Sequence, residues 1–147
     1  MSKENLVKNV NQQIASWTVL YTKLHNYHWF VKGYQFFTLH EKFEELYNEA
    51  SVHIDELAER LLALGEEPVA TLKESLVLSL VGEATGKESA DQMVETIYND
   101  FQTLMKELKK GMDFADKIND EMTGDMLISI HQGLEKHAWM LRSFLGK

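Results

Sequence analysis

Side chains of metal-ligand type share one stripe of a predicted helix. At 100° per residue, Glu44 falls about 40° from His40 around the helix axis. Asp55 and Glu59 fall about 60° and about 100° from the same reference. His28 ends the apolar stripe of the preceding helix, twelve residues before His40. Imidazole and carboxylate ligands together suit first-row divalent metals such as Fe(II), Mn(II) or Zn(II), so these five residues are candidate metal ligands.

The spacing of these residues limits how they can share one ion. His40 and Asp55 are 15 residues apart, which is roughly 22 Å along a helix, and Glu59 is roughly 28 Å away. A metal–ligand bond is about 2 Å long, so one chain cannot bring both ends of the helix to one ion. If these residues bind one ion, two chains must supply them, and an antiparallel two-fold dimer with two equivalent sites meets that condition.

Alternatives apply to the same residues. The acids can lie at a wet boundary of the fold and pair with lysines, without a metal. A site with all ligands inside one helix bundle needs paired Glu-x-x-His motifs. The sequence has none, and its nearest pairs are Glu49 with His53 and Glu135 with His137. Trp29 follows His28 directly and is a candidate electron donor to the site, with simple packing as the alternative.

Helices must position these side chains, and the apolar pattern predicts four long helices and no strands. Large side chains recur at spacings of three and four, which places each set on one helix face. The sets are Val7, Val10, Ile14, Trp17, Tyr21, Leu24 and His28; Leu39, Phe43, Leu46, Ala50, Ile54, Leu57 and Leu61; Met93, Val94, Ile97, Phe101, Leu104, Met105 and Leu108; and Met126, Leu127, Ile130, Leu134, Ala138, Leu141 and Leu145. The shorter piece Leu72–Leu80 predicts a short helix outside the bundle. The expected fold is an all-α four-helix bundle with a short extra helix in the connection between helices 2 and 3.

Local signals predict where these helices begin and end. The stop signals are Gly33 after the first helix and Gly65 with Pro68 after the second. The start signals are two capping boxes, Thr38 with Glu41 and Ser89 with Gln92, and Thr123 as the cap of the last helix. The third long helix is expected to run to about Phe114, and the polar stretch Asp116–Gly124 is expected to form a turn.

Composition restricts the class of protein. The chain has 147 residues, which predicts one domain spanning 1–147, and it has no cysteine, which excludes disulfides and thiolate metal sites. Its 23 acidic residues against 15 basic ones give a net charge of −8, a poor match for nucleic-acid phosphates and a better one for cations. The first thirteen residues form no signal-peptide pattern, and no stretch approaches the ~20 apolar residues of a membrane span. We therefore expect a cytoplasmic protein with no membrane association.

Four segments resemble those of a known family. His28–Gly33, followed after five residues by Leu39–Glu44, resembles the first signature of the Dps family (DNA-binding proteins from starved cells, the mini-ferritins). Ile54–Arg60 is similar to the second signature, and Lys136–Leu141 is similar to the last helix of the family. The resemblance covers nearly the whole chain. It implies a ferritin-like bundle of five helices in each subunit and a hollow homododecamer of tetrahedral symmetry.

The resemblance also implies a ferroxidase centre with two iron ions at each two-fold dimer contact. Asp55 and Glu59 of one chain and His28 of its partner would hold the tighter iron. His40 and Glu44 would serve the weaker position, where many members carry aspartate in place of Glu44. The implied reaction is oxidation of Fe(II), preferably by hydrogen peroxide, with ferric mineral stored in the cavity, which protects the cell from oxidative damage. Zinc or another divalent metal is an alternative occupant of the isolated protein.

Iron needs a path into such a cavity. In similar proteins, positions matching Asp116, Glu121 and Asp125 line three-fold pores whose acids draw cations inward. The alternative is that these acids only complement the dipole of the last helix. Glu41 and Glu45, next to the ligand stripe, are candidate sites of mineral nucleation, with a merely solvated face as the alternative. The short helix within 72–80 would pack at the dimer contact.

The family name points to a different function, compaction of the nucleoid by direct DNA binding with secondary iron binding. Such binding usually depends on a lysine-rich tail. Here the residues before the first helix offer only Lys3, with Lys8 soon after, and the C-terminus at Gly146 and Lys147 has no basic extension. We therefore expect DNA binding to be weak or absent. A purely structural helical oligomer is the remaining alternative, and the five competent ligand side chains argue against it.

Overall fold

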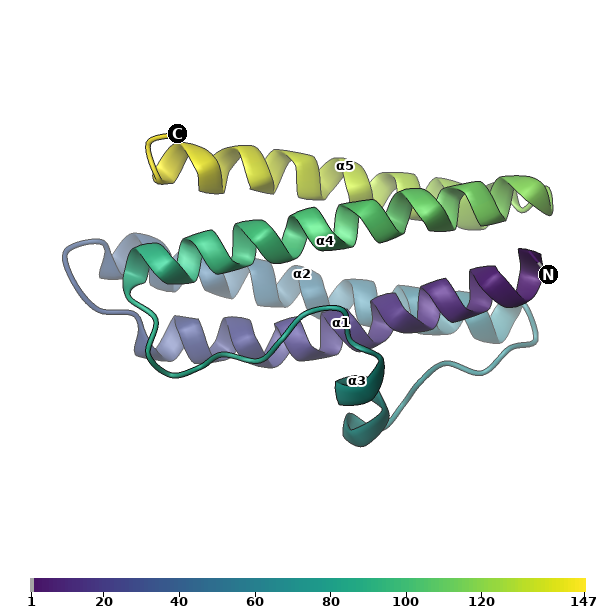
Figure 1. Ribbon diagram of the computed structural model, residues 1–147, viewed down its shortest axis with the longest axis horizontal. Helices are drawn as coiled ribbons and strands as arrows, with labels where there is room; N and C mark the ends of the chain where they lie inside the picture. Colours follow the sequence, from purple (N-terminus) through teal and green to yellow (C-terminus); the bar gives the residue numbers. More distant parts are fainter. Residues whose placement is uncertain (1) are drawn as a thin grey trace.

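The computed structural model describes the chain from residue 2 to residue 147 and contains five helices and no strand in that range (Figure 1). Met1, the first residue of the expected domain, lies outside the described residues. The helices are α1 (Ser2–Phe30), α2 (Phe36–Ala63), α3 (Leu72–Leu78), α4 (Ala90–Lys117) and α5 (Glu121–Phe144). The four long helices form a bundle and α3 packs on α1 outside it, which confirms the expected all-α architecture. None of the described helices carries an apolar stretch long enough to cross a membrane.

The connection between α2 and α4 determines how the bundle is arranged. It carries α3 and crosses the length of the bundle, so α2 and α4 run parallel while α1 and α5 run the other way (Figure 1). The α1–α2 corner, the start of α4 and the C-terminus therefore gather at one end. The end of α2 and the α4–α5 corner lie at the other end, near the start of α1. The two ends of the α2 ligand stripe consequently belong to opposite ends of the molecule.

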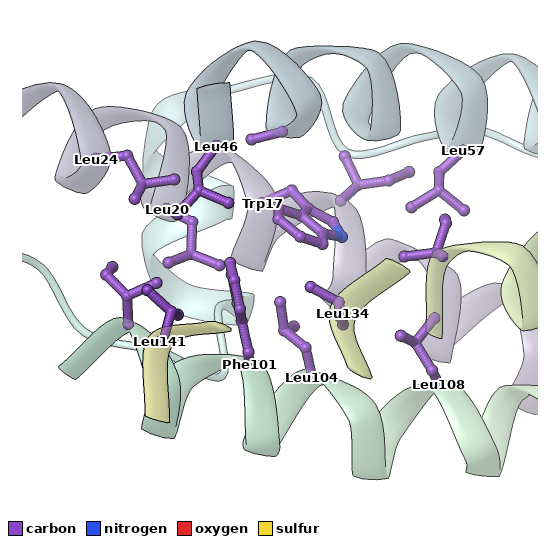
Figure 2. Close-up of a cluster of buried hydrophobic side chains, with 14 of the residues drawn as sticks. Trp17, Leu20, Leu24, Leu46, Leu57, Phe101, Leu104, Leu108, Leu134 and Leu141 are labelled. Atoms are coloured by element: carbon purple, nitrogen blue, oxygen red, sulfur yellow. The ribbon is translucent and has the colours of Figure 1, made fainter. Parts of the chain in front are cut away.

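The core lies between the four long helices, where the predicted apolar faces meet. Trp17 and Phe101 pack near its middle with ring centroids 6.1 Å apart, among leucines from all four helices (Figure 2). Most expected core positions are buried. The exceptions are Tyr21, which is exposed, and a few partly buried positions near the edges of the faces: Val7, Ile54, Met105, Met126 and Leu145. Side-chain periodicity thus predicted the interior, while the edges of each face are wetter than expected.

Two of the expected helix boundaries are correct in detail. Ser89 and Gln92 form the predicted capping box, because the Gln92 amide donates to Ser89 Oγ at 3.2 Å and the Ser89 amide donates to Gln92 Oε1 at 2.8 Å. Gly65, at a φ of +81°, follows the end of α2 as expected. Both positions satisfy backbone groups that a helix end leaves without partners.

The other start signals were wrong. α2 begins at Phe36, whose amide donates to the Gly33 carbonyl at 3.1 Å, so Thr38 lies inside the helix and the box with Glu41 does not form. α4 continues to Lys117, past the expected end near Phe114, so the polar stretch forms no long turn. The cap of α5 is Asp120, which accepts from the Thr123 amide at 3.0 Å, and Thr123 is the residue capped.

Candidate metal site

His28 and His40 meet at the corner between α1 and α2. His28 Nδ1 lies 2.6 Å from the His40 carbonyl oxygen, and His40 Nδ1 lies 2.7 Å from the His28 carbonyl oxygen. The rings stack with centroids 3.7 Å apart and an interplanar angle of 13°. A carbonyl oxygen only accepts hydrogen bonds, so each Nδ1 carries a proton and each neutral ring keeps a lone pair on Nε2. Both imidazoles are thereby held in the tautomer that binds a metal through Nε2.

Glu44 completes a group of three candidate ligands at this corner. Its Oε1 lies 3.9 Å from His28 Nε2, and the Glu44 side chain is about half exposed while that of His28 is buried. Tyr47 packs edge-on against the His28 ring, with centroids 5.3 Å apart. Burial and the nearby Glu44 carboxylate raise the pKa of Tyr47, so its hydroxyl stays neutral at physiological pH. The corner thus brings together the Nε2 lone pairs of two imidazoles, one of them buried, and one half-exposed carboxylate.

Asp55 and Glu59 lie further along α2 and do not join this group within one chain. Both are exposed. The 15 residues that separate His40 from Asp55 on one unbroken helix correspond to roughly 22 Å. Asp55 lines a groove of about 560 Å³ together with Ser51 and residues 68–72 at the start of the crossover. Single-chain geometry therefore leaves a carboxylate pair at one place and an imidazole pair at another.

Trp29 is exposed, and a series of ring contacts connects it to His28. Its ring lies 5.2 Å from that of His25, which stacks on Tyr47 at 3.7 Å. Tyr47 in turn contacts His28. Sequence reasoning singled out Trp29 but not His25 or Tyr47. Their spacing was the available signal, since Tyr21, His25 and Trp29 follow one another at intervals of four residues.

The acids expected at a pore lie near the α4–α5 corner. Asp116, Glu121 and Asp125 are all exposed. Asp120, between them, serves the fold: besides capping α5 it pairs with Arg60 of α2 at 3.0 Å. Burial opposes its ionisation, but hydrogen bonds from Thr123 and the Arg60 charge outweigh that effect and lower the pKa of Asp120. Capping thus accounts for Asp120, while Asp116, Glu121 and Asp125 keep their carboxylates in solvent.

Glu41 and Glu45, the candidate nucleation residues, line a groove of about 480 Å³ between α2 and the end of α5. Glu44 and Met140 line the same groove. Glu45 pairs with Lys42 at 3.0 Å, whereas Glu41 is exposed. Glu41 and Glu45 therefore share a surface with Glu44, and the ion pair with Lys42 restrains the side chain of Glu45.

A cluster that the sequence reasoning missed lies beside this groove. His137 of α5 contacts Glu49 of α2 at 2.5 Å through Nε2, and its Nδ1 lies 3.2 Å from the Lys42 ammonium. Only Glu–His pairs within one helix had been weighed. The available signal was the placement of Glu45, Glu49 and His53 at intervals of four on α2. The α5 partner could be recognised only from the packing of the two helices.

Comparison with known proteins gives consistent matches over the whole chain. The model of the family described as "Ferritin-like domain" matches residues 7–147. General stress protein 20U of Bacillus subtilis is 62% identical over 97% of this chain and 99% of its own length. DNA protection during starvation protein 2 of Bacillus anthracis is 57% identical over 100% of both chains. The crystal structure of a Dps protein from Bacillus brevis superimposes with a TM-score of 0.96 at 56% identity, covering 98% of this chain and 97% of that one.

Proposed function

Since this chain belongs to the Dps family of ferritin-like proteins, we propose that it stores iron and protects DNA by oxidising Fe(II) at sites shared between subunits. The observation that carries the proposal is the corner where His28 and His40 hold each other's Nδ1 protons. That arrangement presents two Nε2 lone pairs, with the Glu44 carboxylate close by, before any metal binds.

The missing ligands are proposed to come from a second copy of the chain. A two-fold axis that places two α2 helices antiparallel brings the Asp55 and Glu59 end of one subunit to the His28 end of the other. Asp55 and Glu59 are exposed, and at the other end Glu44 is about half exposed beside the buried His28 ring. Exposed apolar side chains of α3 would be covered by the same contact. Leu72 lines the Asp55 groove, and Leu76 and Val77 are on the same short helix.

Each residue then has a defined role in the reaction. Asp55 and Glu59 bind one Fe(II) together with His28 of the partner subunit, and His40 and Glu44 bind a second. Hydrogen peroxide accepts one electron from each Fe(II), its O–O bond breaks, and two protons complete two water molecules. Because both electrons are taken by one peroxide molecule, no hydroxyl radical is released. Trp29 would donate an electron when peroxide exceeds iron, and the ring contacts from Trp29 through His25 and Tyr47 to His28 support this role.

Storage requires a closed shell, and we propose the tetrahedral dodecamer of the family, built from the single domain 1–147. Asp116, Glu121 and Asp125 would line its three-fold pores and draw Fe(II) inward. Glu41 and Glu45 would provide carboxylates at which ferric mineral begins to form. With a net charge of −8 on each chain, the shell is expected to protect DNA chemically, by consuming iron and peroxide, and not by coating it.

The test compares oxidation rates of variants with equal charge. The protein is loaded with Fe(II) without oxygen, hydrogen peroxide is added, and ferric absorbance is followed. Asp55→Ala with Glu59→Ala is expected to slow oxidation severely while the assembly persists. The control is Glu95→Ala with Asp113→Ala, which removes two exposed acids of α4. Equal rates in the two double variants would refute the site assignment.

A mixing experiment tests whether the site is shared between chains. Subunits carrying Asp55→Ala and Glu59→Ala are coassembled with subunits carrying His28→Ala and His40→Ala. Each mixed dimer then has one intact site and one empty of all four ligands. Random pairing makes half of the dimers mixed, so activity should return to about a quarter of the wild-type value. If the site lay within one chain, mixing would restore nothing.

A further inference from the structure

A second group of potential metal ligands lies between α2 and α5. Glu45 and Glu49 are one turn apart on α2, and His137 comes from α5. One ligand atom from each of the three lies within 4.8 Å of the others. The His137 side chain is about nine-tenths buried, while both carboxylates are about half exposed. The group therefore joins a fixed imidazole to acids that reach solvent.

The Lys42 ammonium shows where a cation fits in this group. Its Nζ lies 3.0 Å from Glu45 Oε2 and 3.2 Å from His137 Nδ1, with Met140 Sδ at 3.8 Å. An ammonium group only donates hydrogen bonds, so His137 Nδ1 presents a lone pair to it. The ring proton must then be on Nε2, where it faces Glu49 at 2.5 Å. A positive charge thus already sits between an imidazole lone pair and a carboxylate oxygen.

Glu49 has the role that a carboxylate takes behind many metal-binding histidines. It accepts a hydrogen bond from the Nε2–H group of His137. This bond orients the ring and makes the Nδ1 lone pair a stronger ligand for a cation. The imidazole is therefore held ready by a partner that is itself not needed as a ligand.

The surroundings carry more negative charge than Lys42 neutralises. The groove of about 480 Å³ beside the group is lined by Glu41, Glu44 and Glu45, and Lys42 is the basic residue among its lining residues. A divalent ion placed at the Nζ position would balance that charge better than a single ammonium. The groove also leaves room for water to fill the remaining coordination positions, and the long Lys42 side chain can move into solvent without disturbing α2.

We propose that His137 Nδ1 and Glu45 bind a divalent first-row metal ion at the position of the Lys42 ammonium, with Glu49 orienting the imidazole. Nitrogen and carboxylate ligands with open water positions suit Fe(II), Co(II) or Zn(II). The site is complete within one chain and shares no residue with the proposed oxidation site. It gives the chain a defined binding position that includes Glu45, in addition to the exposed carboxylate of Glu41. Lys42 holds the position in the metal-free protein and competes with the incoming ion.

Cobalt(II) is the probe, because its visible absorption reports nitrogen and oxygen ligation. Its binding can also be measured without any iron oxidation. The assembled protein carries Asp55→Ala and Glu59→Ala, which disables the proposed inter-subunit site, and Co(II) is titrated into it. We expect His137→Gln to remove one Co(II) per chain. The matched control is His131→Gln, since His131 is equally buried on the same helix and its Nδ1 lies 3.5 Å from the exposed Glu135.

Variants around the ion test the geometry more closely. Lys42→Met keeps the aliphatic chain and removes the competitor, so Co(II) should bind about tenfold more tightly, the equivalent of one charge-assisted hydrogen bond. Glu49→Gln weakens the hold on the ring and should weaken Co(II) binding by about 10–100-fold. Glu45→Gln removes a ligand and should abolish the site.

The outcomes separate a metal site from a purely structural hydrogen-bond network. Loss of one Co(II) in His137→Gln but not in His131→Gln, with tighter binding in Lys42→Met, supports the site. Equal Co(II) binding by the two histidine variants, or no tightening in Lys42→Met, overturns it. Should His137→Gln fail to assemble, Lys42→Met and Glu45→Gln still decide, because both side chains reach the groove. Rates of iron oxidation are not needed for any of these results.

Discussion

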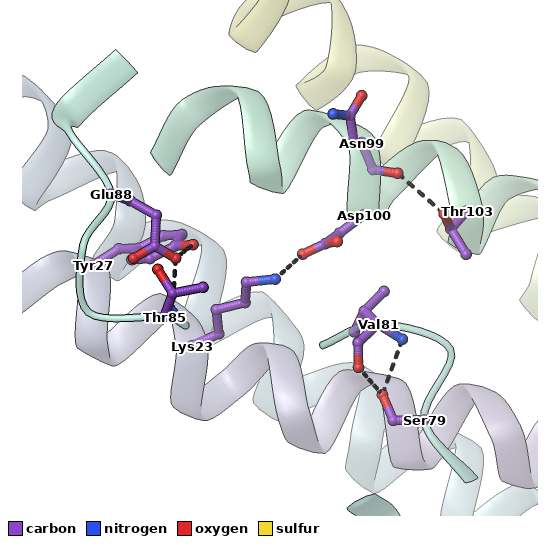
Figure 3. A network of polar contacts seen from close by, with 9 residues as sticks. All are labelled: Lys23, Tyr27, Ser79, Val81, Thr85, Glu88, Asn99, Asp100 and Thr103. Atoms are coloured by element: carbon purple, nitrogen blue, oxygen red, sulfur yellow. Dashed lines mark hydrogen bonds and ion pairs between the residues drawn. The ribbon is translucent and has the colours of Figure 1, made fainter. Parts of the chain in front are cut away.

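The ion pair between Lys23 of α1 and Asp100 of α4 provides a sharp test of how the bundle is held together. Nζ lies 2.7 Å from Oδ2, the Lys23 side chain is 4% exposed, and that of Asp100 is 13% exposed (Figure 3). Burial raises the pKa of Asp100 even though the lysine works in the opposite direction. Desolvation therefore outweighs the attraction, and the ionised pair adds no net stability at neutral pH.

Two substitutions should consequently have opposite effects. Lys23→Met strands a buried carboxylate and is expected to cost about 3–5 kcal/mol, which corresponds to a fall in Tm of roughly 10 °C for a chain of this size. Adding Asp100→Leu removes the stranded charge and should recover most of that loss. Because the pKa of Asp100 is raised in the folded state, the Lys23→Met deficit should shrink as pH falls and the carboxyl is protonated.

Calorimetry at one fixed subunit concentration measures these differences, since the stability of an assembly depends on concentration. The control is Lys110→Met, which breaks the exposed pair with Glu107 at 3.0 Å and should change stability by about 0.5 kcal/mol or less. A Lys23→Met variant with the same Tm as the Lys110→Met control would refute the reasoning. So would a double variant no more stable than Lys23→Met alone.

Three further predictions concern separate features. Gly111→Ala should cost about 1–3 kcal/mol, because its Cβ would lie 2.5 Å from Asn9 Oδ1, whereas Gly133→Ala, with open space around the Cβ, should be neutral or stabilising; thermal melts compare the two. Hydrogen bonds from Tyr27 and backbone amides outweigh the effect of burial and lower the pKa of Glu88 to about 2. The ionised carboxylate therefore stabilises the fold at pH 7, and this contribution is lost as the pH falls from 4.5 toward 2. Glu88→Gln should consequently lower Tm at pH 7, and lower it less below pH 4.5. In a gel-shift assay at physiological salt without divalent metal, the assembled protein should leave duplex DNA unshifted; a strong complex would show that the acidic surface does not prevent binding.

The number of helices and the core followed from the sequence because burial repeats every three to four residues along each helix. Helix starts were harder, since several nearby residues can each cap the same helix. Thr38 and Thr123 both had suitable side chains, but the turn at Gly33 and the pairing of Asp120 with Arg60 decided the outcome. Arg60 lies 60 residues from Asp120, so no local pattern reveals that contact.

The candidate site was predictable to the extent that it depends on one helix. The angular arithmetic placed His40, Glu44, Asp55 and Glu59 on one stripe, and a short connection brought His28 to its start. The reciprocal hydrogen bonds of the two imidazoles depend on the geometry of that connection, which periodicity does not describe. The contact of His137 with Glu49 spans 88 residues and depends on the register of α2 against α5, which the long crossover sets.

The mutual bonding of His28 and His40 also makes the α1–α2 corner preorganised. His28 lies in the last turn of α1, where carbonyl groups lack helical amide partners, and the His40 ring satisfies one of them. The two rings that we propose as iron ligands thus already close the corner, so iron loading would demand little reorganisation and most of the binding energy would be retained as affinity. An empty shell and a filled one should consequently share the same corner, and removal of either imidazole should loosen the junction as well as weaken metal capture.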